Sequence, residues 1–443
     1  MRPVLIASIV CASAIASAAP DEPAVAQAVQ QDWSAKLIEE VDRVAKEVGH
    51  LRGLPRKKPI KREVVSIEDL RKRLADNASN EKNAAELASE SIALERWGVL
   101  PIGTDYGAML VDVLTEQIAG YYDHDARTLY IASRDPAAAD PDSEDWGEML
   151  LSHEIDHALT DQSFDLGKLM KLPDGEGDAE LARRALVEGD GMALMIEYLL
   201  ADKGKAAPWT DPDLTSMLMH TMDADGPASA HLGAAPLWVR ENLIFPYRAG
   251  LAFVASIRRR HPWSSVDAAY RRPPRSTEQI LHPELYRSDD KPIAIKLPAL
   301  LPELRKVWTD VWGEERWGTF LRAHGVADAT ALEAAAGWGG DRLAVYAREG
   351  DDDPLHAIGV AHTAWDSDVD AQEATEALVR ALDAFAGAAA ERTDDGGRWI
   401  DDGRVSWVER RGKDVMIVVG CPAPLADDLR AQLWTAPAKR PRR

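Results

Sequence analysis

The fold of this chain is decided by the stretch EDWGEMLLSHEIDHALTDQ at residues 144–162. A loop rich in Pro, Asp and Ala precedes it, and its apolar residues give enough surface for a packed helix. We therefore predict a helix over residues 144–162. Within it, residues 153–157 match the pattern H-E-x-x-H.

This motif indicates a metal site. His153 and His157 stand at positions i and i+4, so their imidazoles lie on one helical face and can bind one ion. Neutral imidazole is a good ligand for Zn²⁺, at about 2.0–2.1 Å. Glu154 is rotated away from this pair and can reach a metal-bound water as its general base. We expect zinc at His153 and His157.

A catalytic zinc site needs a third protein ligand. Asp161 lies eight residues after His153, about 12 Å along a straight helix, which is too far. Asp165 follows the predicted helix end and remains an alternative. Glu188 is the stronger candidate, because a carboxylate within an apolar helical stripe is costly unless it is paired or bound to metal. That stripe belongs to a second predicted helix, residues 178–201, and consists of Leu181, Ala185, Glu188, Met192, Met195 and Leu199.

These residues carry a family resemblance. The H-E-x-x-H motif followed by Glu188-Gly189-Asp190 resembles zinc metallopeptidases of the gluzincin type. The surrounding sequence is similar to a group of largely uncharacterised, exported bacterial proteins of the peptidase MA-like kind. The similar stretches are EQIAGYYD at 116–123, DQSFDL at 161–166, ALVEGD at 185–190 and STEQILHP at 276–283, which together span roughly residues 96–290.

The resemblance implies a zincin-like catalytic unit, in which the edge strand of a small twisted sheet aligns the substrate over the H-E-x-x-H helix. Residues 127–132 are our candidate for that strand. Asp190 would orient a zinc-bound histidine, the alternative being a helix-surface Asp. A Tyr or His from a later segment would stabilise the oxyanion. Tyr247 and His282 are both candidates, and each also has an ordinary structural explanation.

The remaining chain is expected to fold as α+β. Residues 19–95 have helical periodicity, interrupted by a basic, Pro-punctuated stretch at 52–59 that we interpret as a solvated linker. They form either a pro-region or an integral helical layer. After residue 300 we expect strands at 342–348 and 355–363, a helix at 368–390, strands at 404–409 and 414–419, and a helix at 425–433. This ββαββα order suggests an antiparallel sheet with helices on one face.

The N-terminus resembles a signal peptide. A basic start precedes an apolar run at residues 4–16, and Ala16-Ser17-Ala18 offers small residues for cleavage. We expect an exported, periplasmic or extracellular protein without stable membrane insertion of its mature chain, although an N-terminal anchor or buried helix is the alternative. The predicted parts are a signal peptide at 1–18, a helical region at 19–95, a zincin-like domain at 96–295 and a C-terminal α+β domain at 296–443.

The composition of the chain disfavours some classes of binding partner. The chain has 443 residues, too many for one ordinary core, and a formal net charge of −22. Such a surface repels phosphate backbones and anionic lipid, which disfavours nucleic acid as a partner. Cys11 and Cys421 are too few for a disulfide framework.

The leading hypothesis is zinc-dependent hydrolysis of peptide bonds in a peptide or protein substrate, with Glu154 as general base. One alternative is a zinc-stabilised, non-catalytic binding or scaffold protein on a peptidase-like fold. Another is a hydrolase of non-peptide amides or esters, since the same activated water attacks any suitable carbonyl.

Overall fold

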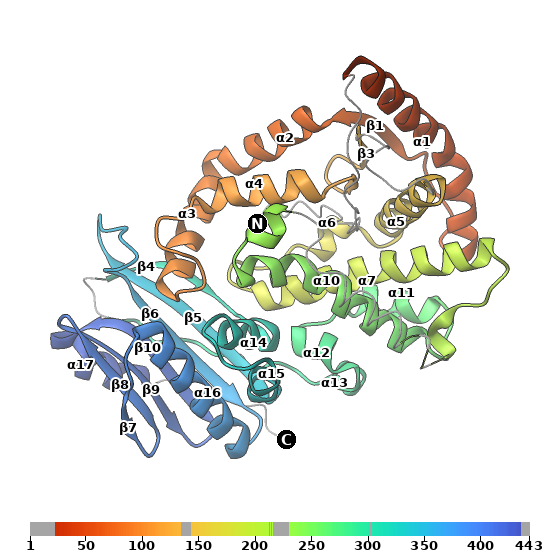
Figure 1. Ribbon diagram of the computed structural model, residues 1–443. Coiled ribbons are helices and arrows are strands. Elements are labelled where there is room, and N and C mark those ends of the chain that lie inside the picture. The colour runs from red at the N-terminus through yellow and green to blue at the C-terminus, as the bar shows by residue number, and fades with distance from the viewer. Residues whose placement is uncertain are drawn as a thin grey trace.

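The computed structural model describes residues 23–133, 143–211, 213, 215, 230–300 and 304–435. The expected α+β class is confirmed: a mainly helical part carries a three-stranded sheet, and a C-terminal part is built on a seven-stranded sheet (Figure 1). The predicted signal peptide lies outside the described residues. None of the described helices is long and apolar enough to cross a membrane.

The helical part contains the two helices that the sequence predicts around its motifs. The first, α5 (Ser143–Phe164), carries His153 and His157, and the second, α7 (Gly177–Asp202), carries Glu188. The elements that precede α7, apart from α5, are α1 (Pro23–Arg52), β1 (Lys61–Ser66), α2 (Ile67–Ser79), α3 (Glu81–Arg96), α4 (Tyr106–Gln117), β2 (Gly120–Asp123), β3 (Thr128–Ser133) and α6 (Leu166–Leu169). Those that follow are η2 (Pro208–Thr210), α9 (Ala230–Ala234), α10 (Leu237–Arg258), α11 (Ser264–Arg271), α12 (Thr277–Leu281) and α13 (Pro283–Ser288).

The small sheet has the order β1-β3-β2, with β1 parallel and β2 antiparallel to β3. Tyr121 and Tyr130 point to the face that α2 and α4 cover, whereas Tyr122, Leu129 and Ile131 point to the face that α1 and α5 cover. This alternation follows from the two-residue period of a strand. The expectation that residues 127–132 form the edge strand is wrong, because β3 is central and β2 is the edge strand that contacts α5.

The N-terminal region is an integral part of this unit. The strand β1 was missed within the expected helical region 19–95, and it completes the sheet by pairing with β3. Helix α1 packs along α5. The expected domain boundary between residues 95 and 96 would therefore divide a single sheet, because β1 lies before it and β2 and β3 lie after it.

The C-terminal sheet has the order β4-β5-β6-β10-β9-β8-β7, and all its neighbouring strands are antiparallel. The expected ββαββα elements are present as β5, β6, α16, β9, β10 and α17. The prediction missed β4, β7, β8, α14 and α15. The elements are β4 (Leu304–Asp310), α14 (Gly313–Ala323), α15 (Asp328–Ala335), β5 (Trp338–Arg348), β6 (Ile358–Trp365), α16 (Asp368–Ala386), β7 (Glu391–Thr393), β8 (Gly396–Asp401), β9 (Arg404–Arg411), β10 (Asp414–Pro422), η3 (Ala423–Leu425) and α17 (Ala426–Leu433).

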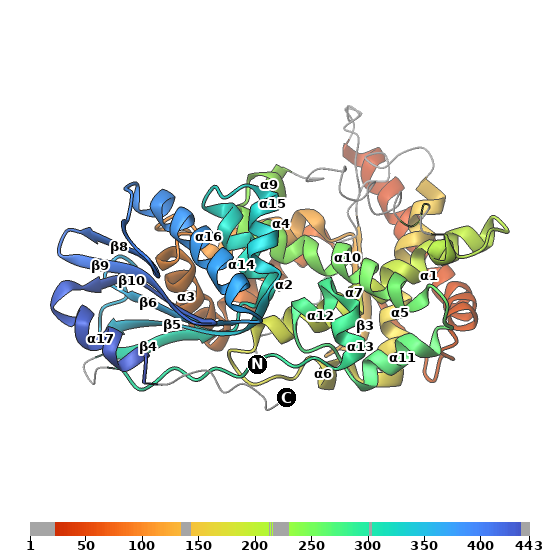
Figure 2. The same ribbon diagram turned by 90° about the horizontal axis from the view of Figure 1, so that it is seen from below.

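Both faces of this sheet are covered. Helices α14, α15 and α16 lie on one face and α17 lies on the other (Figure 2). Leu343 and Val345 of β5 belong to the cluster with α14, α15 and α16, while Ala344 and Tyr346 belong to the cluster with α17. Cys421 is a buried free thiol in the α17 cluster. The expectation that the helices lie on one face is therefore wrong, because the central strands bury apolar side chains on both of their faces.

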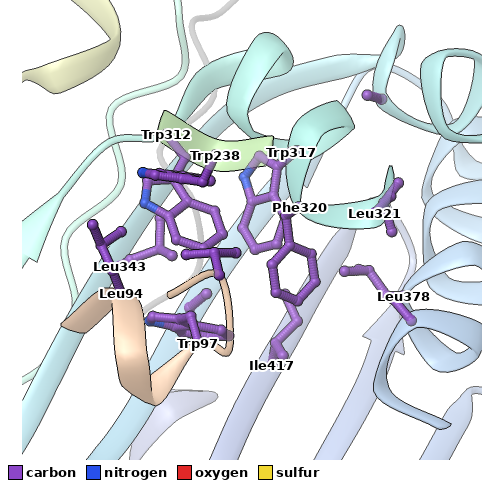
Figure 3. Packing of buried hydrophobic residues seen from close by; sticks show 14 of the residues in the cluster. Leu94, Trp97, Trp238, Trp312, Trp317, Phe320, Leu321, Leu343, Leu378 and Ile417 are labelled. Carbon is purple, nitrogen blue, oxygen red and sulfur yellow. The ribbon is translucent and has the colours of Figure 1, made fainter. Parts of the chain in front are cut away.

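The two parts share one hydrophobic core. Trp97, which follows α3, packs against Trp312 and Phe320 of the C-terminal part, with ring centroids 5.5 and 6.1 Å away (Figure 3). The Trp238 ring of α10 also packs against Trp312, with centroids 4.8 Å apart and the rings tilted by 52°. Buried Asp341 accepts hydrogen bonds from the indole N–H groups that surround it and from the backbone of α14. The expected boundary near residue 295 therefore separates parts with a continuous interior.

Replacing Trp97 tests this shared core. Trp97→Ala should lower the free energy of unfolding by about 3–5 kcal/mol, because a buried aromatic ring leaves a cavity. Ile400 in β8 is 58% exposed, and Ile400→Ala should change the free energy by no more than about 0.5 kcal/mol. Urea unfolding of the full chain measures both values. Equal, small effects would contradict a common core.

Candidate metal centre

Helices α5 and α7 bring three metal-ligating side chains together in the interior. The Nε2 atoms of His153 and His157 lie 3.0 Å apart, and Glu188 Oε2 lies 3.3 Å from the first and 3.4 Å from the second. All three side chains are buried, at 2% exposure or less. Within the described parts of the chain, no other group of three such residues is placed to hold a metal ion.

The spacing of these atoms fits a tetrahedral metal ion. Ligands at 2.0–2.1 Å from zinc lie about 3.3 Å from one another at the corners of a tetrahedron. The three measured separations match one face of that tetrahedron. Two imidazoles and one carboxylate leave the fourth corner for solvent or substrate, as catalytic rather than structural zinc sites do.

The proton balance of the cluster also suits a cation. Burial would raise the pKa of Glu188, but His157 and His153 outweigh burial and lower it to about 2. Burial would lower the pKa of His157, but Glu188 outweighs it and raises that pKa to about 9. Burial and the neighbouring His157 lower the pKa of His153. These shifts indicate that the negative charge of Glu188 favours a positive charge among the three side chains, which a metal ion would supply.

Two glycines beside Glu188 make the geometry possible. A Cβ atom on Gly191 would lie 2.7 Å from the His153 ring, so the imidazole uses the space that the absent side chain leaves. A Cβ atom on Gly189 would lie 2.1 Å from the backbone oxygen of Gly250. Helices α7 and α10 thus touch backbone to backbone one residue after Glu188.

Asp190 takes a different position from the one expected. Both of its oxygens accept from the Arg52 guanidinium, at 3.0 and 2.9 Å, and the Tyr270 hydroxyl donates to it at 2.8 Å. None of its hydrogen bonds goes to His153 or His157. The carboxylate anchors the end of α1 instead of orienting a zinc-bound histidine.

Arg52 was missed as a site residue because it opens the basic stretch that we interpreted as a solvated linker. Its guanidinium is fully buried and also contacts Asp156 of the H-E-x-x-H motif at 3.7 Å and Asp267 at 2.7 Å. The Arg52 guanidinium therefore contacts three carboxylates that lie behind the metal ligands. Burial and Asp190 raise the pKa of Asp156, and Arg52 opposes that rise.

Glu154 lies beside the ligands and next to the edge strand. It is fully buried, and its Oε2 accepts a hydrogen bond from the backbone N–H of Tyr122 in β2 at 2.8 Å. The Tyr122 hydroxyl donates to Asp161 at 3.0 Å. No local pattern marks Tyr122 as a site residue, although it lies within the stretch 116–123 that carries the family resemblance.

The two oxyanion candidates lie in different surroundings. The Tyr247 ring, on α10, stacks near His153 with centroids 6.4 Å apart. His282, between α12 and α13, faces Glu314 of α14, with Nε2 2.9 Å from Oε1. The Glu314 carboxylate raises the pKa of His282. The geometry therefore favours Tyr247, while His282 belongs to the contact with the C-terminal part.

The alternative third ligands are engaged elsewhere. Asp161 accepts from Tyr122 and from the backbone N–H of Leu166 at 2.9 Å. Asp165 begins α6 as its N-cap, where it accepts from Lys168 at 3.1 Å. Neither belongs to the cluster of His153, His157 and Glu188.

Metal analysis of variants tests the ligand set. Glu188→Ala should weaken zinc affinity by at least about a hundredfold, because even changes around zinc ligands cost 10- to 100-fold. Asp165→Ala should keep the wild-type affinity and serves as the control. Competition with a chromophoric chelator measures both constants. Wild-type affinity in Glu188→Ala would remove Glu188 from the ligand set.

Comparison with known proteins concerns the other end of the chain. A search of curated proteins and a search of solved structures gave no match. A family model matches only residues 303–431, which include β4 to β10 and none of the candidate metal ligands. That family is described as a domain of unknown function (DUF8575), and the C-terminal part of this chain is similar to it.

Proposed function

We propose that this chain is a zinc-dependent peptidase of the gluzincin type that acts on peptides or proteins outside the cytoplasm. The observation that carries the proposal is the buried cluster of His153, His157 and Glu188, whose ligand atoms fit a tetrahedral ion with one open corner. Glu154 beside this cluster supplies a base. A structural site with four protein ligands would lack both features.

The residues have distinct roles in this proposal. His153, His157 and Glu188 would hold the zinc, which when bound polarises a carbonyl group and makes water more acidic. Glu154 accepts the proton of the attacking water and passes it to the leaving amine. The N–H of Tyr122 holds one oxygen of Glu154, which fixes the direction of the carboxylate. Tyr247 donates its hydroxyl proton in a hydrogen bond to the oxyanion.

Glu154→Gln tests the base. The variant should bind zinc as the wild type does but lose at least about a hundredfold in turnover, since general bases contribute about 10²–10⁴-fold. Glu148 lies on the same helix and pairs with Arg43 at the surface, so Glu148→Gln should leave turnover unchanged. Cleavage of a proteome-derived peptide mixture, followed by mass spectrometry, measures both.

The same assay separates the other hypotheses. Full activity in Glu154→Gln would refute the mechanism. Absence of cleavage by the zinc-loaded wild type, with loss of folding on chelation, would favour a zinc-stabilised scaffold. Chelator-sensitive hydrolysis of small esters or amides without cleavage of peptides would favour a non-peptide hydrolase.

The oxyanion donor can be identified by comparing two variants. Tyr247→Phe keeps the ring beside His153 but removes the hydroxyl, and should lower kcat by about 10²–10³-fold with little change in KM, as the loss of one oxyanion donor does. His282→Ala should change kcat by less than about threefold, because its imidazole is held by Glu314. The reverse order of effects would assign the donor role to His282.

A further inference from the structure

Two neighbouring cavities outside the metal cluster share part of their lining, and we call the pair the groove. The first, about 210 Å³, lies among α2, α3, α4, α7, α10 and α14, and the second, about 460 Å³, lies among α3, the β2–β3 turn, the loop before α7, and β4. They share Glu86, Glu90 and Glu180 as lining residues. The two cavities are therefore neighbours on either side of these side chains, between α3 and the N-terminal turns of α7.

Two helices lead from this groove to the metal centre. On α7, Glu180 and Arg184 line the first cavity, and Glu188 follows at the same four-residue interval. On α10, Val239 and Leu243 line it, and Tyr247 follows likewise. Residues four apart share a helical face. The groove and the candidate catalytic residues thus lie along one face of each helix.

The two ends of the groove differ in chemistry. The first cavity is walled by apolar side chains, among them Leu87, Leu110, Leu114, Val239 and Leu243. Its arginines are flanked by carboxylates: Arg316 pairs with Asp310 at 3.4 Å, and Arg184 stands between Glu180 and Glu188 on α7. The second cavity is acidic, since six carboxylates, two lysines and His124 line it. Glu176 pairs with Arg342 and Glu86 with Lys82, and the remaining carboxylates keep the lining net negative.

Distances along α7 relate these ends to the reaction centre. With a rise of 1.5 Å per residue, Arg184 lies about 6 Å and Glu180 about 12 Å from the level of Glu188. An extended peptide advances about 3.3 Å per residue. An apolar side chain of such a peptide would therefore enter the first cavity about two residues from the cleaved bond. A basic side chain would reach the acidic cavity about four residues from the cleaved bond.

We propose that this groove selects extended polypeptide segments that carry an apolar side chain about two residues, and a basic side chain about four residues, to one side of the cleaved bond. The proposal rests on the proposed peptidase function and specifies its substrate class. The apolar cavity removes the first side chain from water, and the carboxylates attract the second.

Binding to the inactive Glu154→Gln chain tests the proposal without requiring turnover. The probes are fluorescein-labelled ten-residue peptides of Gly and Ser with one Leu and, two positions further, two Lys residues, made in both sequence directions. Fluorescence anisotropy at low salt measures their affinity. For the direction that binds more tightly, replacing Lys by Glu, or Leu by Ser, should each weaken binding at least tenfold.

Matched variants in the same background locate the binding. A Cβ atom on Gly107, in α4, meets its nearest neighbour at an ordinary 3.7 Å, and the residue lines the apolar cavity. Gly107→Leu should therefore fill that cavity and weaken binding of the Leu peptide at least tenfold, whereas Gly107→Ala should not.

The acidic end has its own pair of variants. Glu86→Gln with Glu90→Gln should weaken binding of the Lys peptide at least fivefold. Glu333→Gln with Glu373→Gln removes equal charge from exposed positions of α15 and α16 and should not change it. Equal affinity for Lys and Glu peptides, or no response to either groove variant, would overturn the proposal. Cleavage by the wild type without these preferences would overturn the proposed selectivity of the groove but not the peptidase function. Selective binding without cleavage would refute the peptidase function but not the selectivity.

Discussion

The structure depends on the burial of one carboxylate against two imidazoles. Glu188 lies in an interior where an uncompensated charge is very costly, and His153 and His157 stabilise it from the neighbouring helix. The backbone of Gly189 lies against that of Gly250, and the His153 ring fills the space over Gly191. These contacts leave little room for the helices to shift. Helices α5, α7 and α10 therefore form a rigid frame, on which a reaction centre needs less reorganisation than one built on loops.

Much of the centre could be predicted because its signals are local. The interval between His153 and His157 defines a helical face, and Glu188 interrupts an apolar stripe, so helix geometry alone identifies the three side chains that the structure brings together. Arg52 could not be found in this way. Its partner Asp190 is 138 residues away, and a basic residue beside a Pro-rich stretch has the composition of a solvated loop.

The sheets show the same limit. The strands predicted at 342–348 and 355–363 pair as β5–β6, and those predicted at 404–409 and 414–419 pair as β9–β10. These hairpins could be predicted because strand-like runs joined by turn residues mark them in the sequence. The pairing of β6 with β10, which joins them, involves residues about 50 positions apart and has no local signature. The parallel pairing of β1 with β3 also has no local signature. The sequence therefore does not show that β3 is the central strand, with neighbours on both sides. The two-sided cover of the large sheet follows from the apolar composition of both faces of β5.

The buried Arg52 bears on how the proposed peptidase could be activated. From the end of α1, its guanidinium contacts Asp156, Asp190 and Asp267 and offsets part of their negative charge. For the peptidase proposed above, removal of the first helix would take this cation away from three acids that lie close to the metal ligands. Activation by excision of α1 is therefore not expected, and any inactive form of that enzyme would be relieved by a change elsewhere in the molecule.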